Sequence, residues 1–152
     1  MTCRAFVAIG ANLGDASAAV NSAIDSLDAL PQTRVEARSS LYRSAPVDAA
    51  GPDFINAVVE LQTALDPEAL LDALQRLETG AGRERPYRHA PRTLDLDLLS
   101  HGDTVLDTPR LTLPHPRMGE RAFVLLPLAE IAPEQVTSLQ LAQVSDQRIE
   151  RL

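Results

Sequence analysis

The sequence contains no lysine and few aromatic residues. All fourteen basic residues are arginine, they are outnumbered by 21 aspartate and glutamate residues, and the formal net charge is −7. Only 3% of the chain is aromatic. A nucleic-acid surface needs clustered positive charge and often uses aromatic rings for stacking, so this composition argues against nucleic-acid binding.

Cysteine and long apolar runs are also scarce. Cys3 is the single cysteine, so no internal disulfide can form, and near the terminus we expect it to be a small apolar residue. No apolar run is long enough to cross a bilayer. The first residues do not resemble a signal peptide, because Arg4 is followed by only five apolar or small residues before Gly10. These absences predict a cytoplasmic protein with no membrane partner.

The length and composition are those of an ordinary globular domain. A chain of 152 residues can bury roughly two thirds of the surface that it exposes when unfolded. Hydrophobic residues make up 45% and charged residues 23%, which is not the composition of a disordered chain. We therefore expect one domain spanning residues 1–152.

Hydrophobic periodicity predicts an α+β fold. Strands are expected at 4–10, 33–43, 54–64 and 94–99, and helices at 16–29 and 67–79. Asp15 or Ser17 can cap the first helix, and Asp66 precedes the start of the second. The β-α-β-β-α-β order is that of the split βαβ, or ferredoxin-like, arrangement, which hosts many functions. A short strand at 104–106, a helix at 117–132 and a final short strand at 149–152 are expected to follow.

Other positions are predicted to lie in turns and loops. Gly10 begins the turn after the first strand, where GxNxG lacks the lysine and the spacing of a phosphate loop. Gly80 and Gly82 are expected to end the second helix. His101 is expected at the surface of a turn, and the tail from Gln135 shows no recognisable chemistry.

The run PRTLDLDLL at residues 91–99 places two carboxylates in a segment with the period of a buried strand. Leucines alternate with Asp95 and Asp97, so the leucines face a core and the aspartates share the other face. Side chains two residues apart on a strand start about 7 Å apart, so their carboxylates can converge on a pair of hard cations. The alternative is an edge strand with a solvated acidic face.

Arginines gather around this strand. Residues 82–92, GRERPYRHAPR, carry four of them, and eight of the fourteen lie between Arg76 and Arg121. Arginine presents a planar fork of donors that suits phosphate oxygens, and carboxylates beside such a loop can hold Mg²⁺ and a polyphosphate together. The alternative is a solvated charged loop. The prolines on either side of His115 hold it in a rigid corner, either to donate to a phosphate or as an ordinary loop residue.

Together these segments resemble the 6-hydroxymethyl-7,8-dihydropterin pyrophosphokinase family of folate biosynthesis. The most specific evidence is PRTLDLDLL followed by LPHPRMGERAFVLLPLAEIAP at 113–133. The resemblance covers about residues 4–135 and includes FVAIGANLGD (6–15), SSLYRSAP (39–46), DFINAVVEL (53–61) and ALLDALQRLETGAGRER (69–85).

The resemblance implies a fold and a reaction. The fold is the ferredoxin-like arrangement with added strands and C-terminal helices, in a monomer.

The implied reaction moves the β,γ-diphosphate of ATP onto the hydroxymethyl oxygen of 6-hydroxymethyl-7,8-dihydropterin and leaves AMP. Two Mg²⁺ ions between the triphosphate and Asp95 and Asp97 would offset charge on the phosphate oxygens and lower the pKa of the attacking hydroxyl. ATP and the pterin are therefore the expected partners.

The resemblance also assigns individual residues. Those expected to act in the chemical step are Arg83, Arg92, Asp95 and Asp97, of which the two aspartates are also the metal ligands. Those expected to bind ATP are Gln75, Glu78, Arg85, Arg92, Leu98, Thr112, His115 and Arg121. Those expected to bind the pterin are Ser44, Ala45, Val47, Phe54, Asn56, Asp95 and Phe123. In this assignment the Asn56 amide pairs with the edge of the ring, and the two phenylalanines stack on its faces.

The chain departs from the commoner family pattern in the arginine-rich loop and its surroundings. His89 stands where members often carry an aromatic residue such as Trp, Pro116 is Tyr in some members, and the loop at 80–90 is one residue short. Two other hypotheses stay open: another Mg²⁺-dependent phosphate enzyme such as a hydrolase, and a noncatalytic ferredoxin-like domain. A noncatalytic domain does not need two metal ligands beside an arginine-rich loop.

Overall fold

The computed structural model describes residues 1–46, 52–82 and 94–152, which form a mixed α/β structure around an antiparallel sheet. The sheet order is β5-β1-β4-β3-β8, and β2 also pairs with β4. The strands are β1 (Cys3–Ala11), β2 (Thr33–Arg38), β3 (Tyr42–Ser44), β4 (Phe54–Thr63), β5 (Asp95–His101) and β8 (Ile149–Arg151). Every pair of neighbouring strands in this sheet runs antiparallel. The prediction of an α+β fold is therefore confirmed as far as an antiparallel sheet covered by helices.

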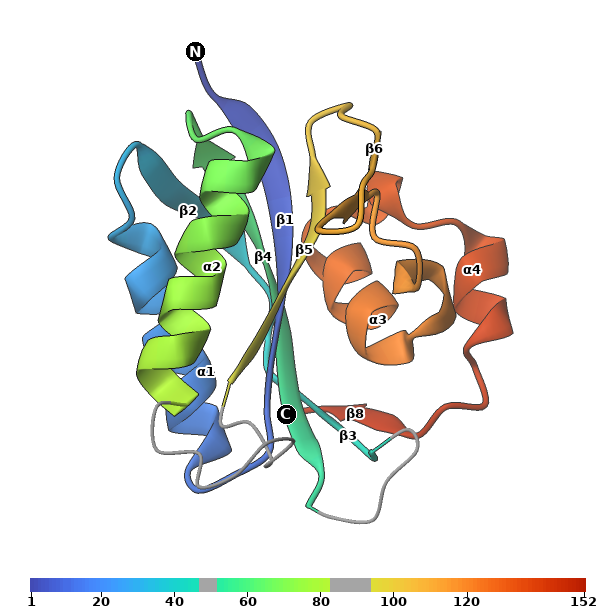
Figure 1. Ribbon diagram of the computed structural model, residues 1–152. Coiled ribbons are helices and arrows are strands. Elements are labelled where there is room, and N and C mark those ends of the chain that lie inside the picture. Colours follow the sequence, from blue (N-terminus) through green and yellow to red (C-terminus); the bar gives the residue numbers. More distant parts are fainter. Residues whose placement is uncertain (47–51, 83–93) are drawn as a thin grey trace.

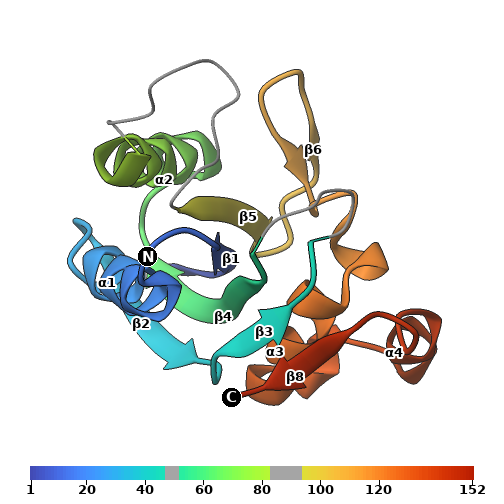
Figure 2. The ribbon, with the colours of Figure 1, turned by 90° about the horizontal axis from the view of Figure 1, so that it is seen from below.

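Helices cover both faces of the sheet (Figure 1). On one face lie α1 (Ala16–Asp28) and α2 (Pro67–Gly82), and on the other lies α3 (Ala122–Ile131). The view from below in Figure 2 shows the same layers, with α4 (Ser138–Gln143) next to α3 on the side away from the sheet. No helix of the described ranges is both long and apolar enough to cross a membrane.

Strand alternation divides the core into two layers. On β1, Val7 and Ile9 pack with the leucines of α1 and α2, whereas Phe6 and Ala8 pack with Val124 of α3. Successive side chains of a strand point to opposite faces, so an apolar run such as CRAFVAIGA supplies both layers. β1 and β4 are consequently buried on both sides.

The predicted caps of the first two helices are present. The Asp15 carboxylate accepts from the Ala18 N–H at 3.0 Å, and that of Asp66 accepts from the Ala69 N–H at 2.8 Å. Each satisfies an N–H that the first helical turn leaves without a partner. Of the two glycines predicted to end the second helix, Gly82 is the last residue of α2, whereas Gly80 lies within it, so the helix is longer than the predicted 67–79.

The strand predicted over 33–43 is instead two strands. Ser40 leaves the ladder because its N–H donates to both carboxylate oxygens of Glu130 on α3, each at 3.0 Å. The short strand expected at 104–106 is displaced to β6 (Leu106–Asp107), which pairs with β7 (Thr112–Leu113). The final strand expected at 149–152 is confirmed as β8.

The helix predicted over 117–132 is interrupted. A 3-10 turn, η1 (Met118–Glu120), precedes α3, and Arg121 between them is extended, with φ −125° and ψ 115°. A second 3-10 turn, η2 (Pro133–Gln135), follows α3. The peptide bond between Leu113 and Pro114 is cis.

The surface position predicted for His101 was also wrong. This side chain is 5% exposed, and its Nε2 lies 2.8 Å from the carbonyl oxygen of Leu65. The turn lies one residue later, where Gly102 has a φ of +55°. His101 is thus held by the segment that leads from β4 into α2.

Candidate active site

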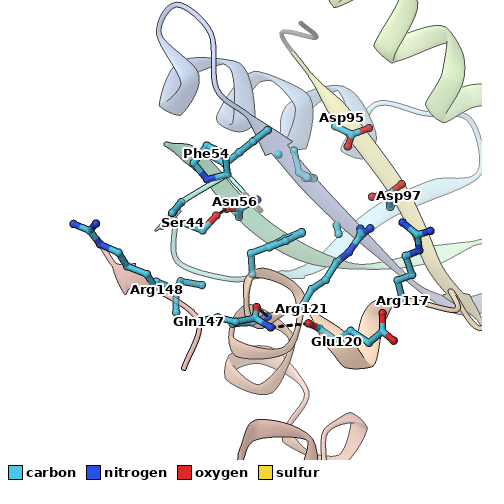
Figure 3. A pocket seen from close by; sticks show the side chains of 18 residues that line it. Ser44, Phe54, Asn56, Asp95, Asp97, Arg117, Glu120, Arg121, Gln147 and Arg148 are labelled. Atoms are coloured by element: carbon cyan, nitrogen blue, oxygen red, sulfur yellow. Dashed lines mark hydrogen bonds between the residues drawn. The ribbon is translucent and has the colours of Figure 1, made fainter. Parts of the chain in front are cut away.

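A pocket of about 980 Å³ lies on the α3 side of the sheet, between the sheet and the start of α3. Its lining comes from β1, β3, β4 and β5, from the η1–α3 segment, and from the chain that leads into β8 (Figure 3). The lining residues are Ala8, Ile9, Gly10, Ser44, Ala45, Pro46, Phe54, Asn56, Asp95, Asp97, Arg117, Glu120, Arg121, Ala122, Phe123, Gln147, Arg148 and Ile149.

Strand β5 brings Asp95 and Asp97 to this pocket. Asp95 is opposite Gly10 and Asp97 is opposite Ala8 on β1, and both carboxylates are half-buried at the pocket wall. Figure 3 shows the two side chains following one another along the same face of the strand. The leucines between and beside them belong to the core of α1 and α2, so the predicted division of this strand into two faces is confirmed.

Ser44 and Asn56 form the buried polar part of the pocket. Each is 5% exposed, and the Ser44 Oγ donates to the Asn56 Oδ1 at 2.6 Å. This bond turns the Asn56 Nδ2 toward Gly10, where an added Cβ would come within 3.2 Å of that nitrogen. Any larger residue here would be in tight contact with that nitrogen. β1 runs past Gly10 to Ala11 and the chain bends at 13–15, so the turn predicted from Gly10 starts later than expected.

Phe54 and Phe123 add aromatic surface to the pocket. Phe54 begins β4, Phe123 lies in the first turn of α3, and both rings are partly exposed among the lining residues. The guanidinium carbon of Arg121 lies 5.4 Å from the centre of the Phe123 ring, within the range of a cation–π contact. The ring and the charge are thus placed together at the start of α3.

Cationic groups face the aspartates. Figure 3 shows the guanidinium groups of Arg117 and Arg121 directed toward Asp97. His115 is held nearby, because its N–H donates to the carbonyl oxygen of Leu99 at 2.8 Å and its Nδ1 accepts from the Arg117 N–H at 3.2 Å. With Nδ1 accepting, the proton of the neutral imidazole lies on Nε2.

Burial lowers the pKa of His115 below the ordinary value of 6.5. The negative charge of Asp97 opposes this shift, while Arg121 and Arg117 act in the same direction as burial. Desolvation disfavours the charged imidazole, and neighbouring guanidinium groups repel it. The ring is therefore neutral at pH 7 and offers one N–H from Nε2.

Other residues that sequence reasoning assigned to ATP lie outside this pocket. Gln75 is exposed on α2 with its Oε1 3.4 Å from a nitrogen of Arg110, which also pairs with Asp72. Thr112 lies in β7. The Leu98 side chain is 3% exposed in the core of α1 and α2, so its backbone is the part that can meet a ligand.

Glu78 joins α2 to the strand that carries the aspartates. Its carboxylate accepts from the Leu96 N–H at 2.8 Å. A charged acceptor on a backbone N–H makes one of the stronger hydrogen bonds in a protein. Glu78 thereby fixes the backbone between Asp95 and Asp97.

Five residues that were assigned or discussed from the sequence lie outside the described residues: Arg83, Arg85, Arg92, Val47 and His89.

The sequence analysis missed one wall of the pocket. Gln147, Arg148 and Ile149 line it, although the tail from Gln135 showed no recognisable chemistry. Arg117 and Glu120 were also unassigned. The one available signal was the expected strand at 149–152, whose pairing with β3 brings Ile149 opposite Ser44.

The donor set of the pocket suits a hard divalent cation shared with a ligand. The described residues contain no group of three or more His, Cys, Asp or Glu side chains suited to hold a metal ion. Asp95 and Asp97 supply two carboxylates, which is what Mg²⁺ takes from a protein when waters and substrate phosphates complete its octahedral shell. The pair therefore fits Mg²⁺ together with a phosphorylated ligand.

Aromatic, amide and paired acidic side chains thus meet in one pocket beside an antiparallel sheet, and such a mixed apolar and polar lining is typical of the small-molecule site of an enzyme domain. The family model for 7,8-dihydro-6-hydroxymethylpterin-pyrophosphokinase (HPPK) matches residues 6–133. The chain belongs to this family, and the prediction of a pyrophosphokinase of folate biosynthesis, a transferase, is confirmed.

Curated relatives carry the same activity in their names. The 2-amino-4-hydroxy-6-hydroxymethyldihydropteridine pyrophosphokinase of Pseudomonas aeruginosa is 49% identical over 135 residues, covering 88% of this chain and 83% of that protein. The enzyme of the same name from Methylorubrum extorquens is 41% identical over 155 residues, covering 98% of each.

Solved structures show a similar fold. Wild-type Plasmodium falciparum HPPK-DHPS with SDX-DHP matches with a TM-score of 0.71 at 14% identity and covers 88% of this chain. The S436F/A437G/A613S triple mutant of the same protein matches with a TM-score of 0.69 at 16% identity. In both cases the chain spans 41% of the other protein's length. At these identities the likeness concerns the fold.

Proposed function

We propose that this protein transfers the β,γ-diphosphate of ATP to 6-hydroxymethyl-7,8-dihydropterin in the presence of Mg²⁺ and releases AMP. The observation that carries the proposal is the position of Asp95 and Asp97 in the same pocket as the bonded pair Ser44 and Asn56. A phosphate-transfer centre and a site for a planar heterocycle are thus next to each other.

The pterin is assigned to the side of the pocket formed by Ser44, Asn56, Phe54 and Phe123. An amide whose oxygen is already held by Ser44 presents its N–H groups in a fixed direction, and these can donate to acceptors on the ring edge. Aromatic rings bury a flat ligand at low entropic cost and favour stacked or edge contacts. Ala8 and Gly10 leave room for a ligand above the sheet, because neither has a long side chain.

The triphosphate is assigned to the side of the pocket that Arg121 lines, with His115 close to it but outside the lining. A guanidinium offers two parallel donors to phosphate oxygens, and the neutral imidazole adds the Nε2 proton. Burial of His115 keeps it neutral, so the ring donates without the desolvation cost of a second full charge. Arg83, Arg85 and Arg92 are proposed from the resemblance alone to contribute to the same end of the site.

Mg²⁺ bound with the triphosphate would withdraw charge from the nonbridging oxygens and lower the pKa of the attacking hydroxyl. Asp95 and Asp97 would hold two such ions, and their carboxylates can also accept the proton that this hydroxyl loses. The antiparallel pairing with Gly10 and Ala8 fixes the spacing of the two carboxylates along β5. The geometry of the acidic pair is therefore set by the sheet before any ligand binds.

The reaction is tested by its nucleotide product. The protein is incubated with Mg-ATP, with and without 6-hydroxymethyl-7,8-dihydropterin, and the nucleotides are separated by chromatography. We expect AMP only when the pterin is present and no AMP when EDTA is added. ADP formed without the pterin would contradict the proposal and support a phosphohydrolase instead.

We also propose that the fold is the ferredoxin-like arrangement, formed as one domain. The order β5-β1-β4 with β2 and β3 beyond β4, and α1 and α2 together on one face, supports this assignment. On this proposal β8 and the segment from α3 onward are additions to that core. A monomeric state, a cytoplasmic location and the absence of nucleic-acid and membrane partners stay predictions of the sequence.

A further inference from the structure

The side chain of Gln147 binds the backbone on both sides of Arg121. Its Nε2 donates to the carbonyl oxygen of Glu120 at 2.7 Å, and its Oε1 accepts from the Ala122 N–H at 2.8 Å. Figure 3 shows Gln147 beneath the pocket, with its bond to Glu120 drawn. Gln147 is far along the chain from these residues, so this contact depends on tertiary structure.

The bonds occur at a helix start that its own N-cap side chain does not cap. Arg121 is the N-cap residue of α3, and its own side chain makes no capping hydrogen bond. The first N–H groups of a helix need an acceptor, and Gln147 supplies one from another segment. Its Nε2 also donates to the carbonyl oxygen of Glu120, the last residue of η1. The extended backbone at Arg121 is therefore held on both sides.

The segment containing Gln147 is itself anchored. Ile149 pairs with Ser44 on β3, and the Glu150 carboxylate accepts from Arg43 at 2.8 Å. The Nε of Arg151 donates to the Ser40 Oγ at 3.1 Å. Strand β8 therefore connects the pterin side of the pocket, at Ser44, with the start of α3, which carries Arg121 and Phe123.

We propose that Gln147 is a positioning residue that holds Arg121 for the triphosphate and Phe123 for the pterin. The inference rests on the proposed function and extends it to the C-terminal segment. Without the two bonds, the Glu120–Ala122 backbone can adopt other conformations, and the guanidinium and the ring lose their common orientation. Gln147 acts through these residues and does not itself take part in the chemical step.

The test compares Gln147→Met with Gln143→Met. Methionine is close to glutamine in size and cannot make either bond; Gln143 is exposed at the end of α4 and its side chain makes no described hydrogen bond. We expect Gln147→Met to lower kcat/KM for ATP about tenfold, because the Glu120 carbonyl and the Ala122 N–H lose their shared partner and the backbone that carries Arg121 is no longer held in place. Gln143→Met should match the wild type.

A double-mutant cycle separates positioning from a general loss of stability. In an Arg121→Ala background, Gln147→Met should change kcat/KM for ATP, measured at saturating pterin, by less than about twofold, because the residue through which it acts on ATP is gone. Multiplicative effects of the two substitutions would overturn the inference. So would a Gln147→Met protein with wild-type kcat/KM, whatever its melting temperature.

Hydrogen exchange provides a readout without catalysis. The Ala122 amide should lose protection in Gln147→Met and keep it in Gln147→Glu, which retains an acceptor for that N–H. Unchanged protection in Gln147→Met would contradict the inference even if activity falls. If the wild type forms no AMP but the exchange result holds, the proposed function fails while the role of Gln147 in fixing this backbone stands.

Discussion

The Ser44 Oγ donates a 2.6 Å hydrogen bond to the Asn56 Oδ1, and both side chains are buried at the edge of the pocket. The bond selects one orientation of an amide that otherwise has two of similar shape. A ligand edge that carries a hydrogen-bond acceptor therefore meets an amide N–H group of Asn56 that is already oriented toward it. Ser44 is expected to contribute to affinity through Asn56 as well as by its own position.

Ser44→Ala should weaken pterin binding about tenfold, because the amide is no longer held and a buried acceptor loses its partner. The measurement is the calorimetric dissociation constant of the pterin in the presence of an unreactive ATP analogue. Ser22→Ala, at an exposed position on α1 across the sheet, serves as the control. Equal affinities of Ser44→Ala and the wild type would show that Asn56 needs no support.

Gly10→Ala should weaken pterin binding by about tenfold or more. The new Cβ would lie 3.2 Å from the Asn56 Nδ2, closer than an ordinary contact, so the amide that presents its N–H groups to the ligand must shift by a few tenths of an ångström. The control is Gly80→Ala within α2, where an added Cβ meets nothing within 4 Å and removal of glycine favours the helix. Unchanged pterin affinity in Gly10→Ala would place the ligand elsewhere.

Asp95→Asn and Asp97→Asn should each lower turnover by about 10³-fold, comparable to the loss of a preorganised charge at a reacting centre. Asparagine keeps the size of the side chain, so the melting temperature should change little. Asp107→Asn on β6, which is exposed, should leave turnover unchanged. Near-wild-type turnover in either pocket variant would contradict the assignment of that residue to the metal ions.

The stability of the wild type should fall more steeply in acid than that of His115→Asn. Burial lowers the pKa of His115 in the folded state, so the unfolded chain binds more protons as the pH falls below about 6.5. Stability from this group is therefore present above pH 6.5 and is lost as the pH falls toward the folded-state pKa. Melting temperatures at pH 7.5 and 5.5 measure the difference; parallel curves for the two proteins would contradict it.

The elements predicted correctly depend on residues close together in the chain. The caps by Asp15 and Asp66 reach an N–H three residues on, and the alternation around Asp95 and Asp97 needs only the pleat of a strand. Such patterns predict the type of an element and which face it buries. The α+β class of the fold and the acidic face of β5 followed from them.

The errors arose where a distant partner decides the conformation. His101 reads as a turn residue beside Gly102, yet its ring lies against Leu65, 36 residues away. The strand predicted over 33–43 breaks at Ser40 because Glu130, 90 residues away, takes its N–H. Each of these hydrogen bonds joins segments far apart in the chain, so it depends on the tertiary fold.

By itself the sequence determined which side chains can do chemistry: the paired carboxylates on one strand face, the arginines around them and the amide of Asn56. Their arrangement into a pocket was decided by tertiary structure. The register of β1, β4 and β5 places Gly10 between Asn56 and Asp95, and the pairing of β8 with β3 brings Gln147 to the start of α3. The physical reason is that sheet pairing and side-chain hydrogen bonds join segments far apart in the chain, and no local pattern records those partners.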